Sequence, residues 1–311
     1  AKAVNYQSAG TVEFVVGKDQ SFYFLEMNTR LQVEHPVTEA VTGRDLVADQ
    51  LRIATGEPLG VAQDEVRSAG HAVEVRLYAE DAEDGFLPAT GRIEALRWPS
   101  GEGVRVDAGI GLGTEVSARF DPMLAKIVAH GHDRAEAFAR LTRALDDTVV
   151  LGVVTNLRFL RWLVRQPVVL AGDARTDTLD RIWPPDDWAE RTSLPGDAWL
   201  AAASGLAATG GGPTGADPWA DGWRLNAVAT VRLETGEATR TVAIAPPDEP
   251  YESVVVGDTV HVDVAGRSVP FRIAPPPDVD RAARAAASHL AAGGTADVVA
   301  PMPGAVLTVH V

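Results

Sequence analysis

The first sixty residues combine a β-hairpin pattern with a helical one. β-Branched and aromatic residues fill 11–16, a turn-forming cluster fills 17–21, and a second apolar run covers 22–25. Across 46–54 the apolar residues recur at helical spacing, and Gly56 ends that run. We therefore expect two paired strands followed by a helix.

The middle of the chain, from about 70 to 183, mixes strand and helix signals. Alternating or short apolar runs predict strands, and apolar residues three or four positions apart predict helices. The expected strands are 72–77, 92–96, 104–106 and 123–128, and the expected helices are 135–145 and 157–164. This mixture is typical of an α+β unit with an antiparallel sheet.

The last third of the chain has a different pattern. Residues 208–221 are rich in Gly and Pro, which indicates a loop or linker. Short strands separated by turn residues are expected at 225–233, 239–245, 253–256, 259–264 and 268–273. Their close spacing predicts a small antiparallel sheet or barrel. Because the sequence lacks an initial Met and ends in a strand-like run, we expect it to be part of a longer chain.

Composition narrows the classes of function. The chain has 311 residues, and its 28 Lys and Arg stand against 43 Asp and Glu, a formal charge of -15. A nucleic-acid-binding surface is basic because it replaces phosphate counterions, so that class is disfavoured. The absence of cysteine excludes disulfides and thiolate chemistry. No apolar stretch reaches the roughly 18 residues of a membrane span, and the start does not resemble a signal peptide. We expect a cytoplasmic protein without a nucleic-acid or membrane partner.

Five polar residues at alternate positions form the most informative stretch. Glu26, Asn28, Arg30, Gln32 and Glu34 would share one face of an extended chain. In an arbitrary sequence, a solvated strand face explains such a pattern. Here the face mixes two acids, a base and two amides, and this set suits a polyanion with a cation better than it suits water.

Glu13 lies on the partner strand of the expected hairpin. It can reach the Glu26 side, and two nearby carboxylates repel each other unless a cation lies between them. Mg²⁺ takes carboxylate ligands and completes its coordination with phosphate and water. The two acids therefore predict a divalent cation beside a phosphate group.

The segment from Tyr6 to Leu59, above all residues 10–14 and 26–39, closely resembles the biotin carboxylase family of ATP-grasp enzymes. The resemblance extends over about residues 1–185, and the eleven-residue motif at 26–36 is far more specific than a lone Gly-rich pattern. Its further motifs are 70–81, 86–88, 120–126 and Asn156.

The resemblance implies a site for ATP and a metal ion. Glu13 and Glu26 would hold Mg²⁺ (or Mn²⁺) on the ATP phosphates, with Asn28 assisting. Val15 and Val153 would touch the adenine, although core packing explains either valine equally well. Mg²⁺ neutralises charge during phosphoryl transfer, which fits these residue types.

The resemblance also implies a site for bicarbonate and biotin. Arg30, Gln32 and the backbone of Val33 would bind bicarbonate, for which a planar guanidinium is a suitable partner. Glu34 would be the general base that deprotonates it. Arg76 would stabilise the biotin enolate, so the expected catalytic residues are Glu34, Arg76 and Arg30.

Other residues inside the motifs are expected to be structural. His35 and His71 are interpreted as hydrogen-bonded structural histidines, and Lys126 as a salt-bridged lysine. At the end of the chain, residues 299–304 resemble the opening of a biotinyl carrier domain. No Ala-Met-Lys-Met motif is present, so the Lys that carries covalent biotin would lie outside this chain. The family's ATP loop and nucleotide-binding lysine are likewise expected upstream.

The expected fold is an α+β multi-domain chain. Its expected parts are the C-terminal part of an ATP-grasp domain (1–68), a biotin carboxylase C-terminal domain (69–189), a β-rich subunit-interaction domain (190–277), a linker (278–296) and the start of a biotinyl carrier domain (297–311).

The expected function is that of a ligase. Only about 115 residues separate the biotin carboxylase-like region from the carrier-like end, which suits the α subunit of an acyl-CoA carboxylase. Such a subunit carboxylates carrier-bound biotin from ATP and bicarbonate through carboxyphosphate, in fatty acid metabolism. Its partners would be a carboxyltransferase β subunit and a biotinyl carrier domain in a hetero-oligomer, and the chain alone would be inactive. Two alternatives stay open: a non-catalytic assembly module that binds the carboxyltransferase, and an ATP-grasp ligase without biotin.

Overall fold

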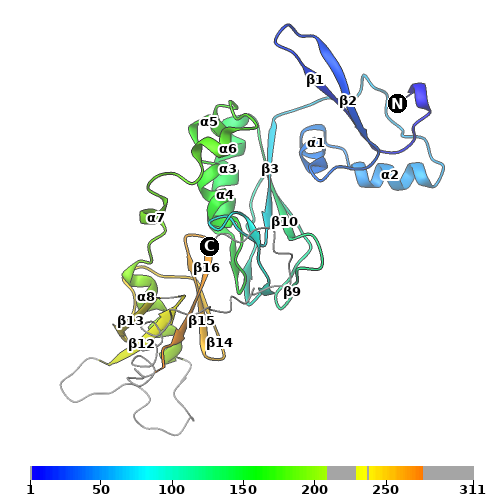
Figure 1. Cartoon of the computed structure of the whole chain (residues 1–311). Coiled ribbons are helices and arrows are strands. Elements are labelled where there is room, and N and C mark those ends of the chain that lie inside the picture. The colour runs from blue at the N-terminus through cyan, green and yellow to red at the C-terminus, as the bar shows by residue number, and fades with distance from the viewer. Residues whose placement is uncertain (1, 209–228, 237, 276–311) are drawn as a thin grey trace, which may run out of the picture.

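The computed structural model describes residues 2–208, 229–236 and 238–275 (Figure 1). The hairpin β1–β2 lies at one end of the molecule and the sheet β12–β16 at the other, with β3 and β10 between them (Figure 1). Three of the sequence predictions lie outside the described residues. These are the loop 208–221, of which only Ala208 is described, the whole linker 278–296, and the carrier start 297–311.

The N-terminal unit is built from the predicted hairpin and two helices. A short 3-10 helix at Lys2–Val4 precedes β1 (Thr11–Val16), which pairs antiparallel with β2 (Phe22–Asn28). The expected helix is α2 (Leu46–Ala54). A second helix, α1 (His35–Thr42), precedes it. Gly43 ends α1 in the left-handed conformation, where glycine has no steric penalty.

The hairpin contains a β-bulge that matters for its two faces. Glu13 is opposite Glu26, but the next residue, Phe14, is opposite Phe24. Leu25 is therefore an extra residue without a partner across the ladder.

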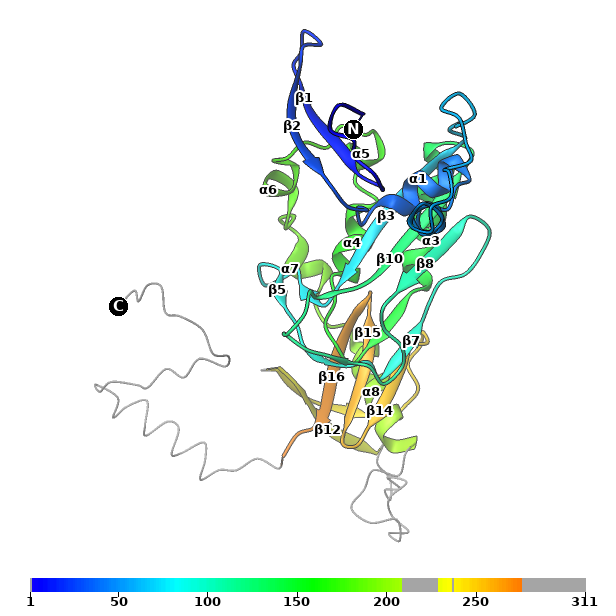
Figure 2. The ribbon, with the colours of Figure 1, turned by 90° about the vertical axis from the view of Figure 1, so that its right-hand side faces the viewer.

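A three-stranded antiparallel sheet organises the middle unit, as predicted. Its order is β3 (His71–Tyr78), β10 (Met123–Gly131) and β8 (Val104–Ala108). The helix α3 (Arg134–Asp147) covers one face, with Asp133 as its N-cap. The helix α1 lies against β3 and β10 on the other face (Figure 2).

Shorter elements complete this unit. The expected strand 92–96 is divided, because Arg92 pairs with β9 whereas Ala95 begins a strand that pairs with β11. The remaining strands are β4 (Glu80–Asp81), β5 (Leu87–Pro88), β6 (Gly91–Arg92), β7 (Ala95–Arg97), β9 (Glu115–Val116) and β11 (Val149–Leu151). The remaining helices are α4 (Leu157–Leu163), α5 (Pro167–Leu170), α6 (Thr178–Ile182) and α7 (Trp188–Arg191).

The middle unit has a continuous hydrophobic core. Leu77, Ile127 and Leu141 are fully buried in it, and they come from β3, β10 and α3. Close packing of this kind makes each buried methylene count toward stability. The core thus fixes the sheet that carries Arg76.

The third unit is a five-stranded antiparallel sheet with one helix, α8 (Gly196–Ala208). The strand order is β13 (Ala238–Ala243), β12 (Thr230–Thr235), β16 (Arg267–Ile273), β15 (Thr259–Val264) and β14 (Ser253–Val256). The predicted sheet is confirmed, but α8 was not predicted. This helix is apolar on nearly all sides, so it lacks the amphipathic stripe that identifies a surface helix. Trp199 of α8 packs edge-on against Phe271 in the core of the sheet.

Charged residues join the sheet to the middle unit. Arg267 donates two hydrogen bonds to the carboxylate of Asp81, at 2.7 and 2.6 Å. The guanidinium of Arg158 donates two to the backbone oxygen of Val264, at 3.2 and 2.6 Å. These contacts are mostly buried, so they hold the sheet in a defined position. No helix in the described part of the chain has the length and apolar character that a membrane span needs.

Candidate active site

The hairpin brings the three predicted metal ligands together. Glu13 and Glu26 are direct partners across the ladder, as the sequence suggested. The side-chain amide of Asn28 donates to Glu13 Oε1 at 2.7 Å and to Glu26 Oε1 at 3.4 Å. One amide thus bridges two carboxylates.

The donor set fits a hard divalent cation. Mg²⁺ prefers carboxylate and amide oxygens and leaves several positions to phosphate or water. Glu13 and Glu26 supply such donors from opposite positions on two strands. The amide of Asn28 faces both carboxylates through its nitrogen, and its oxygen would join them as a donor after the amide turns over. Within the described ranges, no group of three or more His, Cys, Asp or Glu side chains is arranged to hold a metal ion. A cation at this hairpin therefore needs further oxygen ligands from a bound phosphate or from water.

The prediction of one extended face from Glu26 to Glu34 is wrong beyond Asn28. There β2 ends, and the chain turns at Val33 and Glu34 before α1 begins. The backbone oxygen of Gln32 accepts two hydrogen bonds from His35. One comes from the backbone nitrogen at 3.3 Å and the other from the ring Nδ1 at 2.7 Å. This turn satisfies the first backbone groups of the helix, which a continuous strand would not.

The bend still gathers the polar side chains. Arg30, Gln32 and Glu34 line a small cavity of about 180 Å³ between the start of β1 and the start of α1. Gln32 Nε2 also donates to Glu13 Oε1 at 3.3 Å. The expected bicarbonate residues and the expected metal ligands are therefore neighbours.

Arg76 reaches this site from the middle unit. Its Nη2 donates to Glu34 Oε2 at 2.8 Å, and both side chains are about half exposed. Burial alone would lower the pKa of Arg76, but its hydrogen bond to Tyr78 and the nearby carboxylates raise it overall. The guanidinium thus remains charged, and the pair joins two residues that are 42 positions apart.

Lys126 also connects the units. Its Nζ forms a salt bridge with Asp107 Oδ2 at 3.2 Å, as predicted, and donates to the backbone oxygen of Val33 at 3.2 Å. His35 and His71 are hydrogen-bonded too, as expected: His35 to the backbone oxygen of Gln32 at 2.7 Å and His71 to Arg134 at 3.2 Å. The contact between Lys126 and Val33 fixes the turn that precedes Glu34.

The two expected adenine contacts differ in their surroundings. Val15 lies on the hairpin and is 53% exposed, so its side chain is open to a ligand. Val153 is 3% exposed and belongs to the core of the middle unit. Its position favours the core-packing interpretation, in which it contributes to stability and makes no contact with a nucleotide.

Sequence reasoning missed Glu74. Both of its carboxylate oxygens are buried and have no hydrogen-bond partner within the described residues. Burial raises the pKa of Glu74 to about 7. The alternation along β3 contained the signal, because a residue two positions before Arg76 points to the same face of the sheet.

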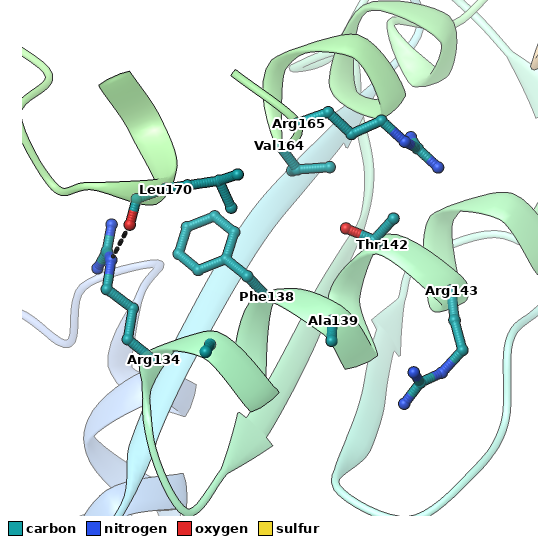
Figure 3. Close-up of a pocket in the computed structure, with 9 residues that line it drawn as sticks. Arg134, Phe138, Ala139, Thr142, Arg143, Val164, Arg165 and Leu170 are labelled. Atoms are coloured by element: carbon teal, nitrogen blue, oxygen red, sulfur yellow. Dashed lines mark hydrogen bonds between the residues drawn. The ribbon is translucent and has the colours of Figure 1, made fainter. Parts of the chain in front are cut away.

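A larger cavity lies elsewhere. It has a volume of about 780 Å³ and opens between α3 and the segment formed by α4 and α5 (Figure 3). Phe138 and Leu170 line it, and Arg134 is held at its rim by a hydrogen bond to the Leu170 backbone oxygen (Figure 3). None of the predicted site residues contributes to its lining.

Two family models match the chain. Residues 74–181 match the biotin carboxylase C-terminal domain, and residues 1–62 match the ATP-binding domain of the carbamoyl-phosphate synthase L chain. The matched ranges contain Arg76 and the whole hairpin site, respectively.

Similar proteins are carboxylase subunits. Over 186 residues the chain is 48% identical to the mitochondrial propionyl-CoA carboxylase alpha chains of Caenorhabditis elegans and of Homo sapiens. The alignment covers 59% of this chain but 26% of each relative, so the chain matches about a quarter of their length.

Solved structures agree with this. The biotin carboxylase domain of 2-oxoglutarate carboxylase from Hydrogenobacter thermophilus, in complex with MgADP, ADP and bicarbonate, is 38% identical with a TM-score of 0.56. That match covers 58% of this chain and 40% of the other. Pyruvate carboxylase from Rhizobium etli, with its allosteric activator acetyl coenzyme A, is 36% identical with a TM-score of 0.60. This second match covers 67% of the chain and 21% of the other.

Proposed function

Because residues 74–181 belong to the biotin carboxylase C-terminal domain family and residues 1–62 to an ATP-binding domain family, we propose that the chain is part of the biotin carboxylase component of an acyl-CoA carboxylase. One observation carries the proposal: the ion pair between Glu34 and Arg76 beside the cavity lined by Arg30 and Gln32. Glu34, Arg30 and Gln32 line this cavity, and Arg76 contacts Glu34. A base, a guanidinium and an amide around one cavity, with a second guanidinium on the base, form a set suited to bind a small anion and remove its proton.

Bicarbonate is the anion that this set suits. Arg30 and Gln32 supply donors for a planar anion, and a guanidinium can bind one through two parallel hydrogen bonds. Lys126 holds the Val33 carbonyl, which orients the backbone of that turn. The chain's own residues thus bind and orient the substrate before any chemistry occurs.

Glu34 would act as the general base. It takes the proton of bicarbonate while a bicarbonate oxygen attacks the γ-phosphorus of ATP and ADP leaves, which gives carboxyphosphate. Arg76 contacts Glu34 directly, so it orients this carboxylate and is placed to bind negative charge that develops during carboxylation.

The hairpin residues Glu13, Glu26 and Asn28 would hold Mg²⁺, which when bound neutralises charge on the ATP phosphates. Biotin, delivered on a carrier, would accept the carboxyl group at N1′, while carboxyphosphate releases phosphate and N1′ gives up its proton. The contribution of this chain is the arrangement of the three side chains, which the ladder register sets.

The acyl-CoA class and the partners are inferred from the relatives. The names of the propionyl-CoA carboxylase alpha chains support an acyl-CoA carboxylase, with a carboxyltransferase subunit and a biotinyl carrier as partners. The five-stranded sheet is the part proposed to contact the carboxyltransferase. Its outer strands β13 and β14 each have one edge without a paired strand within the described residues, and strand edges commonly take part in protein association.

The test is the Glu34→Gln variant of the intact gene product that contains this chain. Removing the base is expected to lower bicarbonate-dependent ATP cleavage by at least about 100-fold, since general base catalysis contributes about 10²–10⁴. Phosphate release with and without bicarbonate is the measurement. Glu57→Gln, an exposed carboxylate in a loop, is the control and should retain full activity. Near-normal turnover of Glu34→Gln would refute the assignment.

A further inference from the structure

We propose that Glu74 is a positioning residue of this site, whose buried carboxyl group sets the charge behind the Glu34–Arg76 pair and thereby the pH response of bicarbonate binding. The inference rests on the proposed function. It adds a residue that the motif at 26–36 does not contain.

The sheet register places Glu74 behind the site. On β3, Glu74 and Arg76 point to the same face because side chains alternate along a strand. Arg76 is opposite Lys126 on β10, and Lys126 is opposite Asp107 on β8. Three adjacent strands therefore present charged side chains to the face that α1 covers.

The surroundings of Glu74 are unusual for a carboxylate. Directly across the ladder lies Val128, which is buried and apolar. Both carboxylate oxygens of Glu74 are buried, and neither has a hydrogen-bond partner in the described part of the chain. A buried charge without a hydrogen bond is costly, so the neutral form is favoured.

Four charged groups act on Glu74 most strongly. The positive charges of Lys126 and Arg76 favour its ionised form, and the negative charges of Glu34 and Asp107 oppose it. Burial outweighs the net attraction and raises the pKa of Glu74 to about 7. Its charge therefore changes near neutral pH, where an ordinary Glu is already ionised.

The other packed elements also carry charges. On the α1 side, Arg105 of β8 is paired with Glu39 of α1 at 2.6 Å, and this pair adds little net charge. On the opposite face of β3, the guanidinium of Arg134 of α3 is positive and is bonded to His71. Arg134 is not among the groups that act most strongly on Glu74, so the state of Glu74 decides the balance on the α1 side.

The net charge of Glu74 and the four groups that act on it most strongly determines the expected effect on bicarbonate binding. When Glu74 is protonated, the charges of Arg76 and Lys126 cancel those of Glu34 and Asp107. When Glu74 is ionised, the group carries one negative charge beside the proposed anion site. The affinity for bicarbonate should therefore fall as the pH rises through about 7.

The experiment compares the KM for bicarbonate of the intact wild-type gene product and its Glu74→Gln variant between pH 6 and 8.5. The wild-type KM, expressed as bicarbonate concentration, is expected to rise on the order of tenfold, the order of effect of one nearby unit charge at an effective dielectric constant of about 20. In Glu74→Gln the KM should stay near the low-pH wild-type value. Glu74→Leu, which suits the apolar neighbour Val128, should behave in the same way. Parallel profiles in wild type and both variants would overturn the inference.

A second readout follows the titration without activity. A carboxyl group with a raised pKa costs stability as the pH rises from its unfolded pKa, near 4.5, to its folded pKa, near 7. The unfolding temperature of Glu74→Gln, relative to that of wild type, should therefore increase as the pH rises from about 4.5 to about 7. Above pH 7 the difference should stay constant. Glu102→Gln is the matched control, since this carboxylate is 91% exposed, and it should change neither readout.

The outcomes separate the two proposals. A constant stability difference across this window, or a stability gain without a change in the KM profile, overturns the role of Glu74 and leaves the proposed function intact. Wild-type protein without bicarbonate-dependent ATP cleavage overturns the proposed function itself and the inference with it.

Discussion

The N-terminal hairpin unit and the middle unit differ sharply in how they are held together. In the middle unit a continuous core of fully buried side chains joins the sheet to α3. The hairpin unit contributes no residue to either hydrophobic cluster of the described chain. Its large side chains are exposed on both strands: Phe14, Val15, Val16, Phe22, Tyr23, Phe24 and Leu25.

The comparison shows where stability and chemistry reside. Most of the proposed site lies on the unit without a core, and polar contacts attach it to the unit that has one. Glu34 binds Arg76, the Val33 carbonyl binds Lys126, and Glu39 binds Arg105. Clustered exposed apolar side chains commonly mark surfaces that contact a partner or a ligand. The site therefore depends on contacts made outside its own unit.

The largest expected loss of stability comes from a substitution in the core of the middle unit. Leu141→Ala removes a fully buried side chain from α3 and should lower the free energy of unfolding by about 3 kcal/mol. Leu51→Ala, at an exposed position of α2, should change it by less than about 0.5 kcal/mol. Urea denaturation followed by tryptophan fluorescence measures both. Equal losses at the two positions would contradict the contrast between the units.

An intermediate effect is expected at the junction between the middle unit and the sheet. Asp81→Asn removes the carboxylate that Arg267 binds twice, and should cost about 1.5 kcal/mol of unfolding free energy. Burial would raise the pKa of Asp81, but the hydrogen bonds from Arg267 lower it overall. The stabilisation is therefore present above the unfolded pKa of about 3.8 and is lost as the pH falls below that value.

Denaturation at pH 7 and at pH 3 checks this, since the difference between wild type and Asp81→Asn should shrink at the lower pH. The exposed pair Arg181–Asp177 offers a control, and Asp177→Asn should have an effect below about 0.5 kcal/mol at both values. A pH-independent difference for Asp81→Asn would show that the ion pair is not its cause.

The smallest effect on stability is expected on the hairpin. Tyr23→Thr replaces a side chain that is 66% exposed with another good strand former, so the free energy of unfolding should change by less than about 0.5 kcal/mol. Self-association of residues 1–311, measured by sedimentation velocity, should decrease because apolar surface is removed. A loss above about 1 kcal/mol would mean that the hairpin is packed like the middle unit.

Local patterns allowed most of the regular elements to be predicted. The hairpin and β10 were recognised as short apolar runs, β3 by its alternation, and α3 by the helical spacing of its apolar residues. What could not be predicted depends on contacts between distant residues. The approach of Arg76 to Glu34 and the burial of Glu74 both require knowledge of the β3–β10 register and of the position of α1.

Asn156 illustrates the same limit. The motifs included this residue, but no pattern revealed its task. Its side chain accepts a hydrogen bond from the backbone nitrogen of Tyr78 at 2.9 Å and donates to the backbone oxygen of Arg76 at 3.2 Å. It thus ties the start of α4 to the end of β3, next to the proposed site.

The single extra residue in β2 has a consequence for the whole hairpin. In a regular strand, Phe24 and Glu26 would be two positions apart and would point to the same face. With Leu25 inserted, Phe24 packs with Phe14 at a ring distance of 6.2 Å, whereas Glu26 points to the side of Glu13. The inserted residue thus shifts the alternation by one position, so that aromatic rings and carboxylates at even-numbered positions lie on opposite surfaces. A bulge-free strand of the same residues would place both groups on one surface.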